Sequence, residues 1–142
     1  MSLKDIPVKL EGAPDGGEPG GMALALLHEI AGHLSTVAAG GERQVVELGS
    51  LPLSDADREL LREKLGRGEV EAKVFASGLT EVYETAFPGV WWVKYFHDGD
   101  THVAEQLEIG TVPMILESHI EDIQASAERF PQLVEQTERN PQ

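Results

Sequence analysis

Two stretches of this chain carry apolar residues at the spacing of one helix face. Between residues 22 and 39 these residues recur about every 3.6 positions and form one stripe, which is typical of an amphipathic helix. The stripe comprises Ala23, Leu26, Leu27, Ile30, Leu34 and Val37. Gly40-Gly41 ends this helix. A second helix is predicted over residues 54–65, because Ser54 is a good N-cap and Asp57 occupies the capping-box position.

Alternating apolar and polar residues predict a group of strands in the middle of the chain. The expected strands are Gln44–Leu48, Glu69–Ala76, Glu81–Phe87, Val90–Phe96 and Thr101–Ile109. His97–Asp100 has the composition of a hairpin turn. Connections this short imply antiparallel neighbours, because a parallel crossover needs a dozen or more residues.

The chain is expected to become helical again after Pro113. Ser118 and Glu121 fit a capping box, and Pro131 is expected to break or kink the helix. The residues that share one face of this helix are Ile120, Ile123, Ala127 and Phe130. The order of elements predicts an α+β fold, with an antiparallel sheet of about four to five strands and two to three helices packed mainly on one face.

Glycine and proline divide the chain into three parts. Residues 11–21 contain five glycines and two prolines, so residues 1–21 are predicted to be a flexible leader. Residues 22–131 are expected to form a single domain, since 142 residues is an ordinary size for one. Residues 132–142 are expected to be a helical extension or a tail.

The predicted strand over residues 90–96 contains both tryptophans of the chain, side by side. Alternation places Trp91, Val93 and Tyr95 on one face and Val90, Trp92 and Phe96 on the other. Two apolar faces fit a central strand that is covered on both sides, or a strand with one face left for a partner or a second copy. The candidate partner-binding residues are Glu84, Thr85, Phe87, Pro88, Gly89, Trp91, Trp92 and Tyr95.

Charge and composition exclude several classes of function. The net charge of −14 disfavours binding to nucleic acid or to an anionic membrane surface. The absence of cysteine excludes disulfides, thiolate catalysis and Cys-ligated metal centres within this chain. No apolar run reaches the roughly 18 residues of a membrane span, and the N-terminus is interrupted by charges, unlike a signal peptide. A cytoplasmic protein is therefore the default expectation.

The search for chemical motifs gives no catalytic residue, no metal site and no cofactor. His28 and His33 stand five residues apart, about 140° around a helix, so they cannot share an ion as the histidines of a zincin helix do. The carboxylates of the strands, Glu105 and Glu108 among them, are expected to be solvated, and those two should point to opposite faces. His97 and His102 flank a turn without a third ligand, which is a weak metal signal.

Three segments together resemble the C-terminal domain of the HupH/HyaF hydrogenase expression/formation family. They are LGRGEVEA at residues 65–72, ETAFPGVWWV at 84–93 and EQLEIGTVPMIL at 105–116. The LPLSDAD stretch and the GGE that ends the first helix also fit, so the resemblance covers roughly residues 22–130.

The resemblance implies a non-catalytic accessory protein, a chaperone or assembly factor, for the maturation of [NiFe]-hydrogenase. Its implied partner is a hydrogenase subunit precursor, with the small subunit favoured, and other hydrogenase accessory proteins are further candidates. One alternative is a scaffold or dimeric adaptor for other maturation factors, with its dimer seam at the aromatic strand. A less favoured alternative is a metal-binding protein or enzyme that uses the acidic sheet face. A homodimer remains open.

Overall fold

The computed structural model describes residues 20–97 and 102–141, with side chains throughout except at residues 102 and 103. The predicted leader, apart from its last two residues, and residues 98–100 of the predicted turn at His97–Asp100 lie outside the described residues. The helices are α1 (Gly21–Ala38), α2 (Asp55–Leu65) and α3 (Ile120–Arg139), with short 3₁₀ turns η2 (Leu48–Ser50) and η3 (Met114–Leu116). The strands are β1 (Gln44–Glu47), β2 (Glu71–Phe75), β3 (Leu79–Glu84), β4 (Val90–Phe96) and β5 (His102–Ile109).

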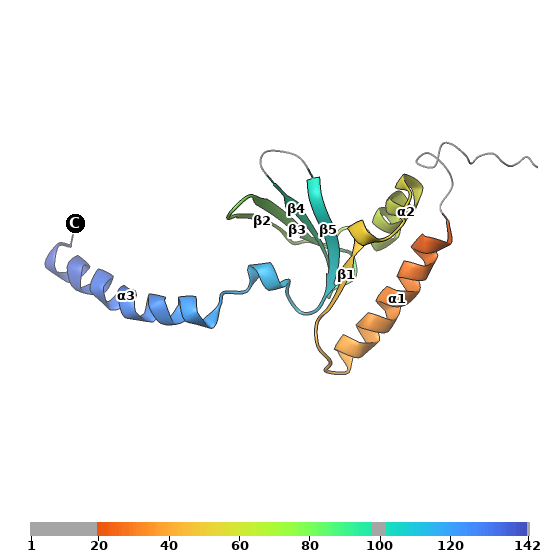
Figure 1. Cartoon of the computed structure of the whole chain (residues 1–142). Helices are drawn as coiled ribbons and strands as arrows, with labels where there is room; N and C mark the ends of the chain where they lie inside the picture. The colour runs from red at the N-terminus through yellow and green to blue at the C-terminus, as the bar shows by residue number, and fades with distance from the viewer. Residues whose placement is uncertain (1–19, 98–101, 142) are drawn as a thin grey trace, which may run out of the picture.

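The five strands form one antiparallel sheet with the order β1-β5-β4-β3-β2, as Figure 1 shows. The predicted α+β fold is therefore confirmed. β4, the tryptophan strand, lies in the middle and is hydrogen-bonded along both edges. β3 begins two residues before the predicted strand and ends at Glu84, because Thr85–Gly89 is used for the turn into β4.

α1 and α2 cover one face of the sheet and enclose the main core (Figure 1). The buried residues of this core are Ala23, Leu26, Ile30, Val46, Leu48, Leu61, Leu65, Tyr83, Val90, Trp92, Leu107 and Ile109. The predicted stripe of the first helix supplies Leu26 and Ile30, which are 2% and 3% exposed. Each such aliphatic side chain stabilises the fold by about 1.5–3 kcal/mol relative to an exposed one.

The opposite face of the sheet carries a smaller cluster made by Val82, Trp91 and Val93. The residues that pack against this cluster are Tyr95, Ile115 and Leu116, so the cover on this side includes the short turn η3. β4 is thus buried on both faces, as expected for a central strand between two layers.

The starts of α1 and α2 are joined by one side chain. Ser54 and Asp57 form the predicted capping box at the N-terminus of α2. The Asp57 carboxylate also accepts a hydrogen bond of 2.8 Å from the Gly20 backbone N–H. Asp57 is 3% exposed, and its bonds satisfy amides at the starts of two helices. This link fixes where the chain enters α1.

α3 departs from the sequence prediction at its N-terminus. Its N-cap is His119 and no side chain caps it, so the predicted capping box of Ser118 and Glu121 is wrong. Pro131 lies inside the helix, which continues to Arg139. No residue of α3 is buried, and Figure 1 shows the helix projecting away from the sheet. None of the helices in the described ranges is long and apolar enough to cross a membrane.

Candidate partner-binding segment

The candidate residues of the segment from Glu84 to Tyr95 divide into an interior and an exterior set. Thr85 and Trp92 are 1% and 0% exposed, and Trp91 is 6% exposed. Glu84, Gly89 and Tyr95 are partly exposed. Phe87, which is 51% exposed, and Pro88 stand on the surface. The segment therefore contributes to the cores on both faces of the sheet and also presents one turn to solvent.

Trp92 faces α2 and is tied to a buried carboxylate. Its indole N–H donates a hydrogen bond to Glu105, which is 3% exposed and also accepts one from Arg58 of α2. The carboxylate is thus paired and hydrogen-bonded from two elements, which is the condition for burying a charge. These bonds fix the position of α2 over β4 and β5.

Aromatic and cationic groups stack beside Trp92. The ring of Tyr83 lies parallel to that of Trp92, with centroids 5.9 Å apart. Arg67 lies 3.8 Å from the Tyr83 ring centroid, and Arg62 lies 5.9 Å from the Trp92 ring. Burial raises the pKa of the Tyr83 phenol, the charges of Arg67 and Arg62 lower it, and that of Glu105 raises it; the net direction is upward from 10.0.

Trp91 lies on the opposite face, where its indole N–H donates to the carbonyl oxygen of Gly110 at 3.2 Å. Glu108, next to it on β5, is 3% exposed and accepts hydrogen bonds from the Met114 amide and the Gln106 side chain, both at 2.9 Å. Arg43 Nε lies 3.6 Å from Glu108, within ion-pair distance. The Glu108 carboxylate therefore anchors η3 to the sheet.

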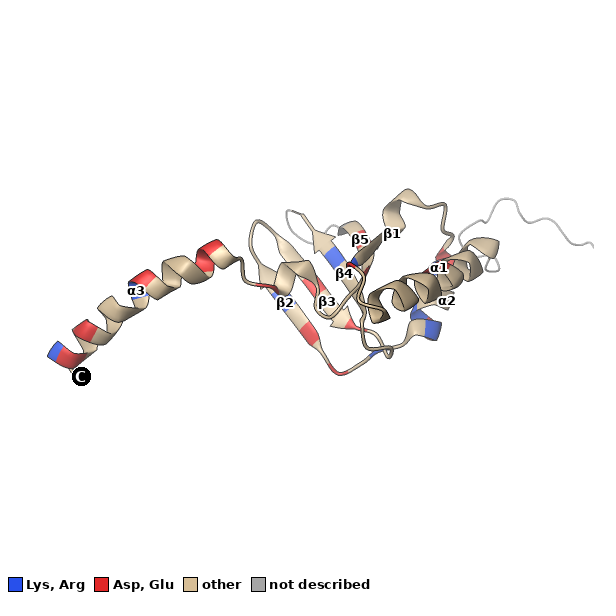
Figure 2. Cartoon of the chain, turned by 90° about the horizontal axis from the view of Figure 1, so that it is seen from below, with Lys and Arg blue, Asp and Glu red and all other residues tan. Residues whose placement is uncertain are grey.

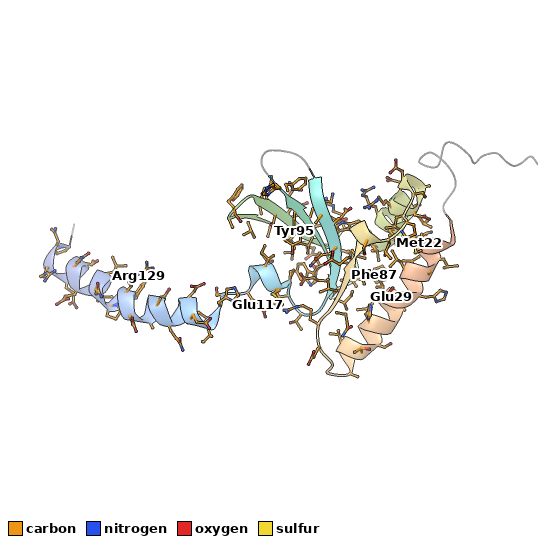
Figure 3. The ribbon with its side chains drawn as sticks, viewed as in Figure 1. Met22, Glu29, Phe87, Tyr95, Glu117 and Arg129 are labelled. Carbon is orange, nitrogen blue, oxygen red and sulfur yellow. The ribbon has the colours of Figure 1, made fainter. Side chains whose placement is uncertain are left out.

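Arg43 continues this network along the segment that leads to α3. Its Nη2 donates to the Val112 carbonyl and to Glu117, each at 3.1 Å. Since Arg43 immediately precedes β1, it joins the edge of the sheet to the segment that contains η3. Figure 3 labels Glu117 between the sheet and α3.

The turn that carries Phe87 and Pro88 is rigidly built. The Thr85 hydroxyl accepts a hydrogen bond from the Phe87 amide at 3.2 Å, and the Val90 amide donates to the Phe87 carbonyl. Gly89 has a φ of 98°, a left-handed conformation that favours glycine. The backbone of this turn therefore fixes the position of Phe87, which Figure 3 labels.

Tyr95 lines a groove on the η3 side of the sheet. The groove has a volume of about 490 Å³ and is lined by Arg43, Val45, Tyr95, Gln106, Glu108, Met114, Ile115, Glu117 and His119. Burial raises the pKa of the Tyr95 phenol above 10.0, and the carboxylates of Glu108 and Glu47 raise it further. Met114 is 55% exposed at the rim, so this groove offers both apolar and polar contacts.

The sequence prediction for the strand carboxylates is half right. Glu105 and Glu108 do lie on opposite faces, as their spacing requires, but both are buried and neither is solvated. Their partners Arg58 and Arg43 were not predicted, because they lie 47 and 65 residues away in the sequence. The sequence feature that could have indicated these partners was a glutamate within an apolar strand, because a carboxylate is costly to bury without a cation.

The histidines do not form a metal site in the described part of the chain. His28 is exposed, while His33 contacts Glu29 of the same helix at 3.1 Å. No group of three or more His, Asp or Glu residues within the described ranges could hold a metal ion. The proposed pair of His97 and His102 is not tested, because the side chain of His102 lies outside them.

Known proteins resemble this chain over the region that contains the tryptophan segment. A family model described as the HupH hydrogenase expression protein, C-terminal conserved region, matches residues 22–137. Hydrogenase expression/formation protein HoxQ of Azotobacter vinelandii is 38% identical over 93 residues, which are 66% of this chain and 33% of that protein. HupH of Rhodobacter capsulatus is 31% identical over 113 residues, 80% of this chain and 41% of the relative.

A solved structure supports the match in three dimensions. Hydrogenase expression protein HupH from Thiobacillus denitrificans ATCC 25259 superimposes with a TM-score of 0.77 at 36% identity, covering 83% of this chain and 98% of that one. The chain spans about a third to two-fifths of the length of the curated relatives it matches. With the family model matching well over half of its residues, the chain belongs to the HupH hydrogenase expression protein family, whose C-terminal conserved region it carries.

Proposed function

We propose that this chain is a non-catalytic accessory protein for the maturation of [NiFe]-hydrogenase, and that it binds a subunit precursor, with the small subunit favoured, in the cytoplasm. Family membership carries this proposal, because the relatives are named hydrogenase expression/formation proteins and the match includes the whole tryptophan segment. Those relatives are longer, so the proposal concerns the part of their role that resides in the shared region.

The geometry of the segment supports a contact at Phe87 and Pro88. Both side chains are exposed, and the Phe87 ring contributes an apolar surface on a fixed turn. A preorganised aromatic anchor binds without the entropy cost of ordering a loop. The buried Thr85 supports the turn from inside through its hydroxyl, and Tyr95 belongs to the groove on the η3 side.

The proposal is tested by recovering the tagged full-length chain from hydrogenase-producing cells and identifying bound proteins by mass spectrometry. A hydrogenase subunit precursor is the expected partner. Phe87→Ser should reduce its recovery by about 10–30-fold, the effect of losing an interface anchor of about 2 kcal/mol. The thermal unfolding midpoint should stay near that of the unmodified chain.

Leu24→Ser is the matched control, because Leu24 is a similarly exposed apolar residue, 58% accessible, on α1. It should leave the recovery unchanged. Recovery of other maturation factors without any subunit would favour the scaffold or adaptor alternative, and stoichiometric metal in the purified chain would favour a metal-binding protein. If no hydrogenase component is recovered at all, both the chaperone and the adaptor hypotheses are wrong.

A further inference from the structure

α3 presents an apolar stripe that nothing in the described chain covers. The large apolar side chains of this 20-residue helix are 45–62% exposed. They are Ile120, Ile123, Phe130, Leu133 and Val134. Figure 3 shows the side chains of α3, Arg129 among them, projecting on all sides of a helix that stands apart from the sheet.

A helix in this situation gains little stability from its own residues. Isolated helices are marginal in water, and packing of the apolar face supplies most of the stability of a protein helix. Pro131 adds a cost inside α3, because it has no N–H to donate to the carbonyl of Ala127. The persistence of α3 as one helix therefore calls for a surface that covers the stripe.

The spacing of the stripe suits packing against another helix. Successive seam positions are separated by 3, 4, 3, 4 and 3 residues, which is the heptad pattern of a coiled coil. These positions are Ile120, Ile123, Ala127, Phe130, Val134 and Thr137. A facing helix with the same repeat accepts each of these side chains between its own.

The seam is complementary to itself when two copies run antiparallel. Pairing Ala127 with Phe130 of the other copy places a small residue opposite a large one. The same register sets Ile123 opposite Val134 and Ile120 opposite Thr137, so each of the six positions has a partner. Such an interface has two-fold symmetry and closes as a dimer.

Charge also favours this surface for the meeting of two copies of a chain with net charge −14. The positions that flank the central seam carry no charge, and they are Gln124, Ser126, Pro131 and Leu133. Glu121, Glu128 and Glu135 recur every seven residues on the other side of the helix. Figure 2 shows acidic residues at intervals along α3. Opposed carboxylates are therefore kept out of the centre of the contact.

We propose that α3 is a dimerisation helix whose apolar stripe packs against α3 of a second copy of this chain, in antiparallel orientation. This goes beyond the proposed function and does not depend on it. The dimer contact lies on α3 and leaves β4 and the Phe87 turn unchanged in both copies.

The oligomeric state of the full-length chain tests the proposal by sedimentation equilibrium. The unmodified chain should be a dimer. Phe130→Glu should weaken dimerisation by at least about 30-fold, as expected for a seam anchor. Arg129→Glu, which adds negative charge at the neighbouring position on the outer face, is the matched control and should remain dimeric. The fluorescence of Trp91 and Trp92, both remote from α3, should show that every variant keeps a folded body.

The register can be tested by cross-linking, because the chain has no cysteine of its own. In the antiparallel register, chains with Ile123→Cys and chains with Val134→Cys should form a mixed disulfide after subunit exchange. Neither variant should cross-link with itself, since positions 123 and 134 differ by 11 residues, or ~16 Å along the helix.

Three results would overturn the proposal. A monomeric unmodified chain would mean that α3 serves a different partner. A disulfide between two copies of the Ile123→Cys variant would show that the helices are parallel. A dimer that survives Phe130→Glu would place the contact on another surface, such as the groove beside Tyr95.

Discussion

The two adjacent tryptophans allow a matched test of the buried carboxylate. Trp92→Phe and Trp91→Phe make the same chemical change one residue apart, and each removes one indole N–H from a buried ring. The hydrogen bond that is lost has a different acceptor in each variant. It is the carboxylate of Glu105 for Trp92 and the neutral carbonyl of Gly110 for Trp91.

The expected magnitudes follow from the charge of the acceptor. A hydrogen bond to a charged group contributes about 1.5–3 kcal/mol, and one between neutral groups about 0.5–1.5 kcal/mol. The loss of ring volume is common to both variants and largely cancels in the comparison. Trp92→Phe should therefore lower the free energy of unfolding by about 1–1.5 kcal/mol more than Trp91→Phe does.

Urea unfolding followed by fluorescence measures this difference, since each variant keeps one tryptophan. With a slope of about 1–3 kcal/mol per molar urea, the midpoint of Trp92→Phe should lie about 0.3–1.5 M below that of Trp91→Phe. Both substitutions are then repeated in a Glu105→Gln background, which neutralises the acceptor and leaves the shape of the site. In the Glu105→Gln background, Trp92→Phe should lower the free energy of unfolding no more than Trp91→Phe does. The reasoning fails if Trp91→Phe is the more damaging change, or if the excess persists without the carboxylate.

Two further predictions concern the phenols and one glycine. Tyr83 and Tyr95 both have folded-state pKa values above 10.0, so the folded state holds these protons more tightly. The contribution of the two phenols to the free energy of unfolding should therefore be fully present below about pH 10 and be lost as the pH rises further. Near-ultraviolet titration of phenolate should show both midpoints above 10, and midpoints at or below the ordinary value would contradict the burial argument. Gly68→Ala should destabilise the fold by about 2 kcal/mol or more, because its Cβ would lie 2.5 Å from the Thr85 carbonyl oxygen. Gly49→Ala meets no atom within 4 Å and should change the unfolding free energy by less than about 0.5 kcal/mol, so equal thermal midpoints for the two variants would refute the steric argument.

Local periodicity was sufficient to predict the elements and the orientation of β4. The alternation of residues 90–96 placed Trp91 and Trp92 on opposite faces, which the structure confirms. The capping box of Ser54 and Asp57 was also predicted, because all of its atoms lie within four residues. Features of this kind depend on neighbours in the sequence, and a single chain displays them.

The remaining features depend on contacts between distant residues. The burial of Glu105 and Glu108 requires Arg58 and Arg43, and no local pattern pairs them. The same holds for Asp57, whose bond to Gly20 was not foreseen because the two lie 37 residues apart. Tertiary pairing of this kind decides whether a strand carboxylate is solvated or enclosed.

α3 shows that the sequence can predict a helix without predicting what packs against it. Its apolar stripe was read correctly as the face of a helix, but the expectation that helices pack on the sheet does not hold for it. Periodicity reports that a helix face is apolar and does not report what covers that face. The failed capping box at Ser118 belongs to the same region, where an extended stretch replaces the expected helical start.

The hydrogen bonds from Arg43 to Val112 and Glu117 have a mechanical consequence. A force applied to α3 travels down the chain to Glu117, where the guanidinium already ties that residue to Val112 and to the edge of the sheet. The intervening segment bears little tension until those bonds break. A force from anything bound to α3 should therefore break the Arg43 hydrogen bonds and detach η3 first. The hydrogen bonds between β5 and β4 should break only afterwards.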